Sequence, residues 1–169
     1  VTLDSVQSVD DSTFELSGGA QLTLPATIER FRFNRGYGSD PSLSAASLFR
    51  AHGQGTLLDL RAIRSIELNT FGNFVAIAAE GGGTVDLGNC DAITGASLIL
   101  SAQSSGTLRM DRLTTLNFSD TSYWYLGVER QEFPVLRAIA RCNISLQPEG
   151  LVNGMMLCAP KLRDIDQST

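Results

Sequence analysis

The residues best suited to bind a ligand lie in the segment SYWYLGV, which spans residues 122–128. This segment contains the only tryptophan of the chain, Trp124, and two of its three tyrosines, Tyr123 and Tyr125. Aromatic faces attract the C–H faces of pyranose rings, and a tyrosine adds a hydroxyl group for polar contacts. The segment therefore indicates a platform for a sugar chain. The plainer alternative is an exposed aromatic strip that binds nothing.

Other residues join this platform if the chain forms repeated strands that stack on one another. Tyr123 and Tyr125 then point outward, and Phe74 lies beside them on a neighbouring strand. Two positions further along the same face, three side chains come within reach of sugar hydroxyl groups: Glu80, Gln103 and Glu129. A shift of one residue moves every side chain of a strand to the opposite face. In that alternative, Trp124 forms the platform and the two tyrosines belong to the core.

The chain has few residues for metal or histidine chemistry. Its single histidine, His52, excludes most metal sites and most histidine-based catalysis. The three cysteines, Cys90, Cys142 and Cys158, fit neither a metal-site spacing nor a closed set of disulfides. The glycines at 81–83 are not a phosphate-binding loop, because no Lys-Ser or Lys-Thr follows them. We therefore expect no metal site and no cofactor.

Three carboxylates are the strongest candidates for catalysis, namely Asp111, Asp120 and Glu129. A pair of them could serve a hydrolase that works with two carboxylates. No pair is singled out by its spacing, however, and short, regular coils offer no obvious cleft. We therefore expect no catalytic residue, and a polysaccharide lyase or hydrolase is the least favoured alternative.

The elements that must position these residues are encoded by a repeat. The triplet Gly-Thr-aliphatic begins at Gly55, Gly83 and Gly106, so the copies are 28 residues (55 to 83) and 23 residues (83 to 106) apart. Around the triplets, the segments LFRAHGQGTLLDL, AIAAEGGGTVDL and ILSAQSSGTLRM align without gaps. Their apolar residues alternate with small or polar ones, as in a β-strand. Periods of about 20–50 residues are typical of stacked repeats.

Downstream of each triplet, apolar residues recur at every third position in three columns. The columns are Leu60, Leu87 and Met110; Ile63, Cys90 and Leu113; and Ile66, Ile93 and Leu116. A looser version begins at Leu24, and later versions contain Leu136, Ile139 and Cys142, and then Leu162 and Ile165. The pattern places Cys142 in the column of Ile66 and Leu116. Cys90 and Cys142 are therefore expected to be buried free thiols, and a Cys142–Cys158 disulfide is the alternative.

The repeat predicts that residues 1–169 form a single all-β domain. Each unit contains two or three short strands and no convincing helix, which favours a right-handed parallel β-helix (β-solenoid) of about five or six coils. Equivalent residues then stack about 4.8 Å apart along the axis. The glycine of each triplet permits the corner conformation, and the threonine favours the strand that follows. A β-sandwich with accidental similarity is the alternative.

Insertions interrupt the repeat before the strand that holds residues 98–103 and before its equivalents. They are NRGYGSDPS, NTFGN and SDTS, and a later one is QPEGLVNG. We expect them to emerge from one edge of the solenoid, where such insertions often form a binding face; they carry Tyr37 and Phe71. Arginines beside the apolar columns are expected to cover the flanks, at positions 61, 64, 109, 112, 137 and 141.

Composition excludes several classes of protein and partner. With 43% hydrophobic and 18% charged residues, the chain is not expected to be disordered. Its net charge of −5 argues against nucleic acid and anionic membranes as partners. No apolar run approaches the roughly 20 residues of a membrane helix. Because the chain starts at Val1 without a signal peptide, we expect a mature or excised module of a larger protein.

The segments LLDLRAIRSIEL and LRMDRLTTLNF resemble the leucine-rich β-solenoid repeats of large secreted bacterial proteins. In fold and size the chain is also similar to the β-helical carbohydrate-binding modules of bacterial plant-polysaccharide hydrolases, notably xylanases. The resemblance implies a secreted or cell-surface, non-catalytic module that binds an extended polysaccharide such as xylan. It also implies catalytic or surface domains appended in the parent protein. A structural or adhesive cell-surface solenoid segment is the alternative.

Overall fold

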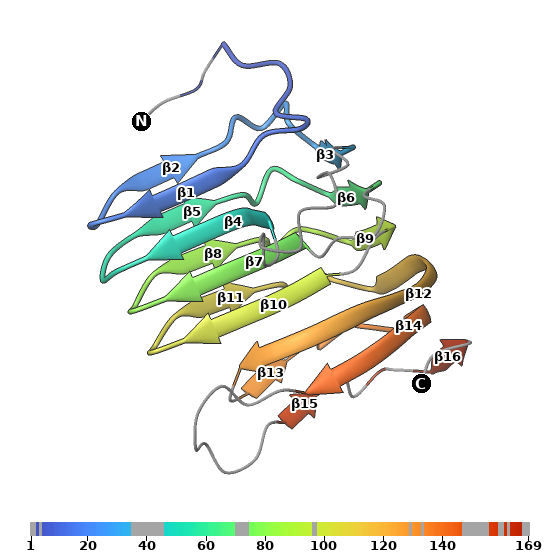
Figure 1. Cartoon of the computed structure of the whole chain (residues 1–169). Coiled ribbons are helices and arrows are strands. Elements are labelled where there is room, and N and C mark those ends of the chain that lie inside the picture. Colours follow the sequence, from blue (N-terminus) through green and yellow to red (C-terminus); the bar gives the residue numbers. More distant parts are fainter. Residues whose placement is uncertain are drawn as a thin grey trace.

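The chain folds as a parallel β-helix, which we describe from a computed structural model (Figure 1). The described residues are 3, 5–34, 46–69, 75–95, 98–128, 130–132, 134–146, 156–158, 161 and 163–166. Within these ranges the regular elements are all strands: β1 (Phe14–Ser17), β2 (Gln21–Thr23), β3 (Arg30–Phe33), β4 (Ala46–His52), β5 (Leu57–Asp59), β6 (Ser65–Leu68), β7 (Val75–Glu80), β8 (Thr84–Asp86), β9 (Ala92–Gly95), β10 (Leu98–Gln103), β11 (Thr107–Arg109), β12 (Thr115–Val128), β13 (Arg130–Glu132), β14 (Ala138–Leu146), β15 (Met156–Cys158) and β16 (Asp164–Asp166).

Each coil supplies one strand to each of three faces, and every strand pair is parallel (Figure 1). The first face stacks β1, β4, β7 and β10 with the second halves of β12 and β14. The second face contains β2, β5, β8 and β11, followed by the pair β13–β15. The third face contains β3, β6, β9, the first halves of β12 and β14, and β16.

The described strands make up six coils, because β12 and β14 each turn a corner and serve two faces. The register between β12 and β14 shifts between Asn117 and Ser122, which is where the chain passes from the third face to the first. The predicted all-β parallel solenoid of five or six coils is confirmed. Its right-handed sense, which is usual for parallel crossovers, stays a prediction.

The three apolar columns expected from the repeat are confirmed in the central coils. Asp59 pairs with Asp86 and Asp86 with Arg109, so the residues that follow them stack in the first column. Ile93 pairs with both Ile66 and Leu116 in the third column. Side chains of the three columns are at most 1% exposed and form the core: Leu60, Leu87, Met110, Ile63, Cys90, Leu113, Ile66, Ile93 and Leu116.

The alignment expected for the fifth and sixth coils is wrong by three residues. Ile139 pairs with Leu116 and with Ile165, so it belongs to the third column, whereas Cys142 pairs with Ser122 on the first face. The reason is the spacing of the ladder: apolar residues recur every three positions, so a slip of three leaves the apolar pattern unchanged. Backbone hydrogen bonding between coils removes this ambiguity.

Cys90 is a buried free thiol, as predicted. Its Sγ–H group donates a hydrogen bond to the carbonyl of Ala92 at 3.4 Å. Burial raises the pKa of the Cys90 thiol to about 12, so the group stays protonated at neutral pH and acts as a small apolar residue. The side chains of Cys142 and Cys158 lie outside the described part, so their state stays a prediction.

The corner between the third and first faces receives most of the insertions, as expected. NRGYGSDPS belongs to the connection from β3 to β4, NTFGN belongs to the connection from β6 to β7, and SDTS lies in β12 where that strand passes from the third face to the first. Tyr37 and Phe71 lie outside the described residues. The late insertion QPEGLVNG does not belong to this group, because it connects β14 on the first face to β15 on the second. The expectation of one edge for all insertions is therefore wrong for this segment.

The gapless alignment of the Gly-Thr triplets is wrong by one residue at the first triplet, because Thr84 pairs with Leu57 rather than with Thr56, whereas Thr84 and Thr107 pair as expected. The glycines of the triplets accordingly serve two different purposes. Gly55 has a left-handed backbone, with a φ of 76°. Gly83 and Gly106 do not; instead, a Cβ atom at either position would collide with a backbone carbonyl of the preceding coil, that of Ala51 or Ala79 respectively. The expectation that glycine permits a special corner conformation holds for the first triplet. Close contact between coils explains the other two.

The threonine of the first triplet connects two turns rather than only favouring a strand. Thr56 is 1% exposed. Its hydroxyl donates to the carbonyl of His52 at 2.9 Å and accepts from the backbone N–H of Gly19 in the preceding coil at 3.0 Å. The turn is thereby tied both to its own strand and to its neighbour.

We predict that Gly106→Ala destabilises the protein by about 1–3 kcal/mol, because the added methyl group forces adjacent coils apart at the carbonyl of Ala79. Thr107→Ala is the matched control, since Thr107 is the next residue and is exposed; its cost is expected to be below about 1 kcal/mol. Urea unfolding measures both values. Equal stability of Gly106→Ala and the wild type contradicts the close-packing explanation.

Candidate functional site

The first face carries those predicted ligand-binding residues whose backbone the structure describes, and its backbone register matches the expected one. Trp124 pairs with Leu98 and Tyr125 with Ile99, without the one-residue shift considered as an alternative. Leu98 is fully buried, whereas the Ile99 side chain is half-buried at the surface. The side chains of residues 123–125 are outside the description, so their direction stays a prediction.

The other predicted site residues fall into two groups. Glu80 pairs with Gln103 and with His52, so these residues form one row across β4, β7 and β10, as the repeat predicts. Phe74 and Glu129 lie outside the described residues, and their expected places on the platform stay predictions.

Glu80 is held on the first face by an ion pair with Arg50 and by a contact with His52. Its Oε2 atom lies 2.8 Å from Nη2 of Arg50 and 3.4 Å from Nδ1 of His52. Arg50 also reaches back to Glu15 in the first coil, with Nη1 at 3.0 Å from Oε1. The hydrogen bond from Arg50 is the main reason that the pKa of Glu80 lies below its ordinary value. The carboxylate is therefore ionised and oriented, and 24% of its side chain remains exposed.

Small residues separate the two rows of the predicted platform. Ala78, Ser101 and Gly127 share one register position on β7, β10 and β12. On one side of them runs the row that contains Ile99 and Tyr125, and on the other side runs the row that contains Glu80. Ala78 and Ser101 also fall in one column of the aligned segments AIAAEGGGTVDL and ILSAQSSGTLRM, but nothing in the sequence marks this column as the gap between two rows of a site.

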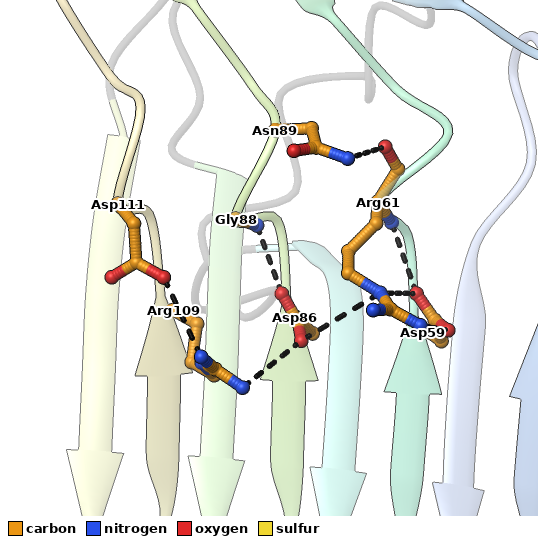
Figure 2. Close-up of polar contacts among 7 residues, drawn as sticks. All are labelled: Asp59, Arg61, Asp86, Gly88, Asn89, Arg109 and Asp111. Atoms are coloured by element: carbon orange, nitrogen blue, oxygen red, sulfur yellow. Dashed lines mark hydrogen bonds and ion pairs between the residues drawn. The ribbon is translucent and has the colours of Figure 1, made fainter.

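A second polar cluster lies on the second face, where equivalent strands end at charged residues (Figure 2). Asp59 and Asp86 are only 5% and 6% exposed. Arg61 binds Asp59 at 2.7 Å and extends toward Asp86 at 3.9 Å. Arg109 in turn lies 3.5 Å from Asp86 and 3.6 Å from Asp111. We call these five residues the Asp–Arg ladder.

Backbone hydrogen bonds show that the ladder shapes the corner after each strand. The backbone N–H of Arg61 donates to Oδ1 of Asp59 at 3.2 Å, and that of Gly88 donates to Oδ1 of Asp86 at 2.9 Å. The amide of Asn89 then donates to the carbonyl of Arg61 at 3.0 Å (Figure 2). Because the two buried carboxylates, Asp59 and Asp86, are bound by groups of the chain itself, this part of the ladder is structural.

The geometry offers little support for catalysis or metal binding in the described part. Asp111, a candidate for a carboxylate pair, is exposed and contacts Arg109. Asp120 and Glu129 are not described at the side-chain level. Among the described residues, no group of three or more His, Cys, Asp or Glu side chains could hold a metal ion. The arginines at 61 and 109 form ion pairs, with side chains that are 59% and 55% exposed; that arginines cover the flanks of the core stays a prediction.

Comparison with protein-family models, with curated proteins and with solved structures found no match to this chain. The resemblance to β-helical carbohydrate-binding modules thus has support at the level of the parallel β-helix and its repeats alone. No element of the described structure is a helix of the length and apolar character needed to cross a membrane.

The Asp–Arg ladder predicts a loss of stability in acid. The hydrogen bond from Arg61 keeps the pKa of Asp59 below its ordinary value of 3.8. A carboxylate with a lowered pKa stabilises the fold fully above the ordinary value, and this contribution disappears as the pH falls through the folded-state value. We expect Asp59→Asn to cost roughly 1–3 kcal/mol at pH 7 and progressively less below about pH 4.

Urea unfolding at pH 7 and at several acidic pH values measures this difference. Asp111→Asn is the control for net charge, because it removes a ladder carboxylate whose side chain is 58% exposed. If the Asp59→Asn protein and the wild type differ by the same amount at every pH, the ion pair does not stabilise the fold in the way described.

Proposed function

We propose that the chain is a non-catalytic module that binds an extended polysaccharide across its first face. The observation that carries the proposal is the register of β12 against β10. It puts the backbone of Tyr125 in the same row as Ile99 and Ala76, which is four residues along the strand from the row of Glu80 and Gln103. In this row, the side chains of Ala76 and Ile99 are half-buried, which supports an outward direction for the Tyr125 side chain.

The shape of this face supports a polymer rather than a small molecule as the ligand. Equivalent residues of neighbouring coils lie about 4.8 Å apart, so the rows form a continuous surface across several strands. Ala78 and Ser101 lie between the row that contains Ile99 and the row that contains Glu80, and their short side chains make a shallow depression between the two rows. A chain of sugar rings can then stack on Tyr125 while its hydroxyl groups reach Glu80 and Gln103.

The electrostatics of the face support a neutral polysaccharide such as xylan. Arg50 lies 2.8 Å from Glu80 and compensates its charge, so this carboxylate does not act as an isolated negative charge next to the platform. Binding is accordingly expected to depend only weakly on salt. In keeping with the resemblance of the sequence, we place this module outside a bacterial cell, attached to catalytic or surface domains of a larger protein.

Affinity electrophoresis on soluble plant polysaccharides, with xylan among them, tests the proposal. We expect a modest dissociation constant of about 10–100 μM, and we expect Tyr125→Ala to lose at least about 1 kcal/mol of binding free energy without unfolding the protein. Asn117→Ala is the matched control, because Asn117 is an exposed residue of the same strand on the third face; it is expected to bind like the wild type.

Two further variants decide which residues form the platform. Unchanged binding by Tyr123→Ala/Tyr125→Ala overturns the assignment of this site. If Trp124→Ala abolishes binding in a folded protein while the double variant binds normally, the platform is built on Trp124. Absence of binding to every polysaccharide overturns the proposed function and favours a structural or adhesive solenoid segment.

A further inference from the structure

The first coil leaves the edge of a sheet at one end of the solenoid. β3 and β1 are both terminal strands of the same sheet, and β3 pairs with β6 alone among the strands of the described structure. An edge strand presents backbone N–H and C=O groups that can pair with a strand of another molecule. In this protein, residues that precede β1 cross this end of the solenoid (Figure 1).

Two aspartates bind the outer backbone groups of β3 and of the residue that follows it. The N–H of Arg32 donates to Oδ1 of Asp10 at 2.8 Å, and the N–H of Asn34 donates to Oδ1 of Asp11 at 2.6 Å. The carbonyl of Arg32 accepts a hydrogen bond from the N–H of Asp11 at 2.9 Å. The segment thus supplies both acceptors and a donor, as a neighbouring strand does.

Comparison with the second coil shows what the aspartates replace. Phe33 pairs with Leu68, so Asn34 is equivalent to Asn69. The N–H of Asn69 donates to the carbonyl of Phe33 in the preceding coil at 2.8 Å. At Asn34 no preceding coil supplies that carbonyl among the described residues, and the carboxylate of Asp11 takes its place.

Apolar residues of the same segment close the end of the core. Val9 is 4% exposed and belongs to the core cluster that also contains Leu22, Leu24 and Ile28 of the first coil. Leu3 and Val6 pack against this cluster as partly buried residues. Asp11 has a left-handed backbone, with a φ of 58°, which places its N–H and its carboxylate on β3 together.

We propose that residues 5–13 are a terminal cap that substitutes for a preceding coil. Val9 seals the apolar end of the core, and Asp10 and Asp11 occupy the edge of β3. The cap keeps this edge closed to the backbone of a second copy of the chain, which is the partner that fits it best, because a second copy offers parallel-sheet strands of the same kind. The proposal is independent of carbohydrate binding.

Hydrogen exchange and sedimentation velocity test the cap on the full chain. In Asp10→Ala/Asp11→Ala, we expect the amides of Arg32 and Asn34 to exchange at least about tenfold faster than in the wild type. We also expect a weight-average mass that rises with concentration more steeply than that of the wild type. The edges of β1 and β2 are the same in the variant and in the wild type. A difference in association between the two proteins therefore reports on the edge of β3.

Two controls separate the cap from a general loss of stability. Asp10→Asn/Asp11→Asn retains an oxygen acceptor at each position and is expected to restore most of the protection and the wild-type mass. Glu15→Ala removes an exposed carboxylate of the same coil and is expected to leave the exchange of Arg32 and Asn34 unchanged.

The cap is overturned if Asp10→Ala/Asp11→Ala keeps wild-type exchange at Arg32 and Asn34 and a wild-type mass. Should this variant fail to fold, the wild type itself gives the answer. Protected amides at Arg32 and Asn34 support the cap, and exchange at the rate of an unstructured peptide overturns it.

Discussion

The parallel hydrogen bonding between successive coils is the constraint on which the rest of the structure depends. It places each strand residue directly on an equivalent residue about 4.8 Å away. Bonds such as Leu60 N–H to the carbonyl of Asp86, at 2.9 Å, continue this register beyond the strands and into the corners. A residue that is too large at a corner therefore affects two coils, which explains why Gly83 and Gly106 lack room for a side chain.

The same constraint creates a problem for charged residues and also its solution. Stacking brings Asp59 and Asp86 into the same column, although like charges at neighbouring positions of a sheet repel each other. Arg61 reaches both carboxylates, and Arg109 in the next coil reaches Asp86 as well. The first face uses the same principle, because Arg50 lies between Glu15 and Glu80. Ion pairs between coils thus stabilise the charged side chains that backbone hydrogen bonding has placed next to each other.

Stacking also separates the scaffold from the surfaces available for recognition. Inward columns are restricted to apolar residues, so differences between coils accumulate in the outward rows, at the corners and at the ends. The half-buried row of Ala76 and Ile99 is one result, and the segment that binds β3 through Asp10 and Asp11 is another. A platform and a closed end are both compatible with a core that repeats without interruption.

Much of this architecture was predictable from the sequence, because a stacked fold repeats its local pattern at a period that can be recognised. The columns around Leu60, Ile63 and Ile66, the burial of Cys90 and the register of Trp124 against Leu98 all followed from the repeat. Local spacing was insufficient at Ile139 and Cys142, since a ladder with a period of three residues looks the same after a slip of three.

Contacts between distant segments were not predictable either: the bond of Asp11 to Asn34, the ladder from Asp59 to Asp111 and the contact of Gly106 with Ala79 depend on which coils become neighbours. The sequence by itself determined the period of the repeat, the core columns and the solenoid fold. Tertiary structure decided the pairing of charges, the closed end and the register after the corner at Asn117, because only folding brings those groups within bonding distance.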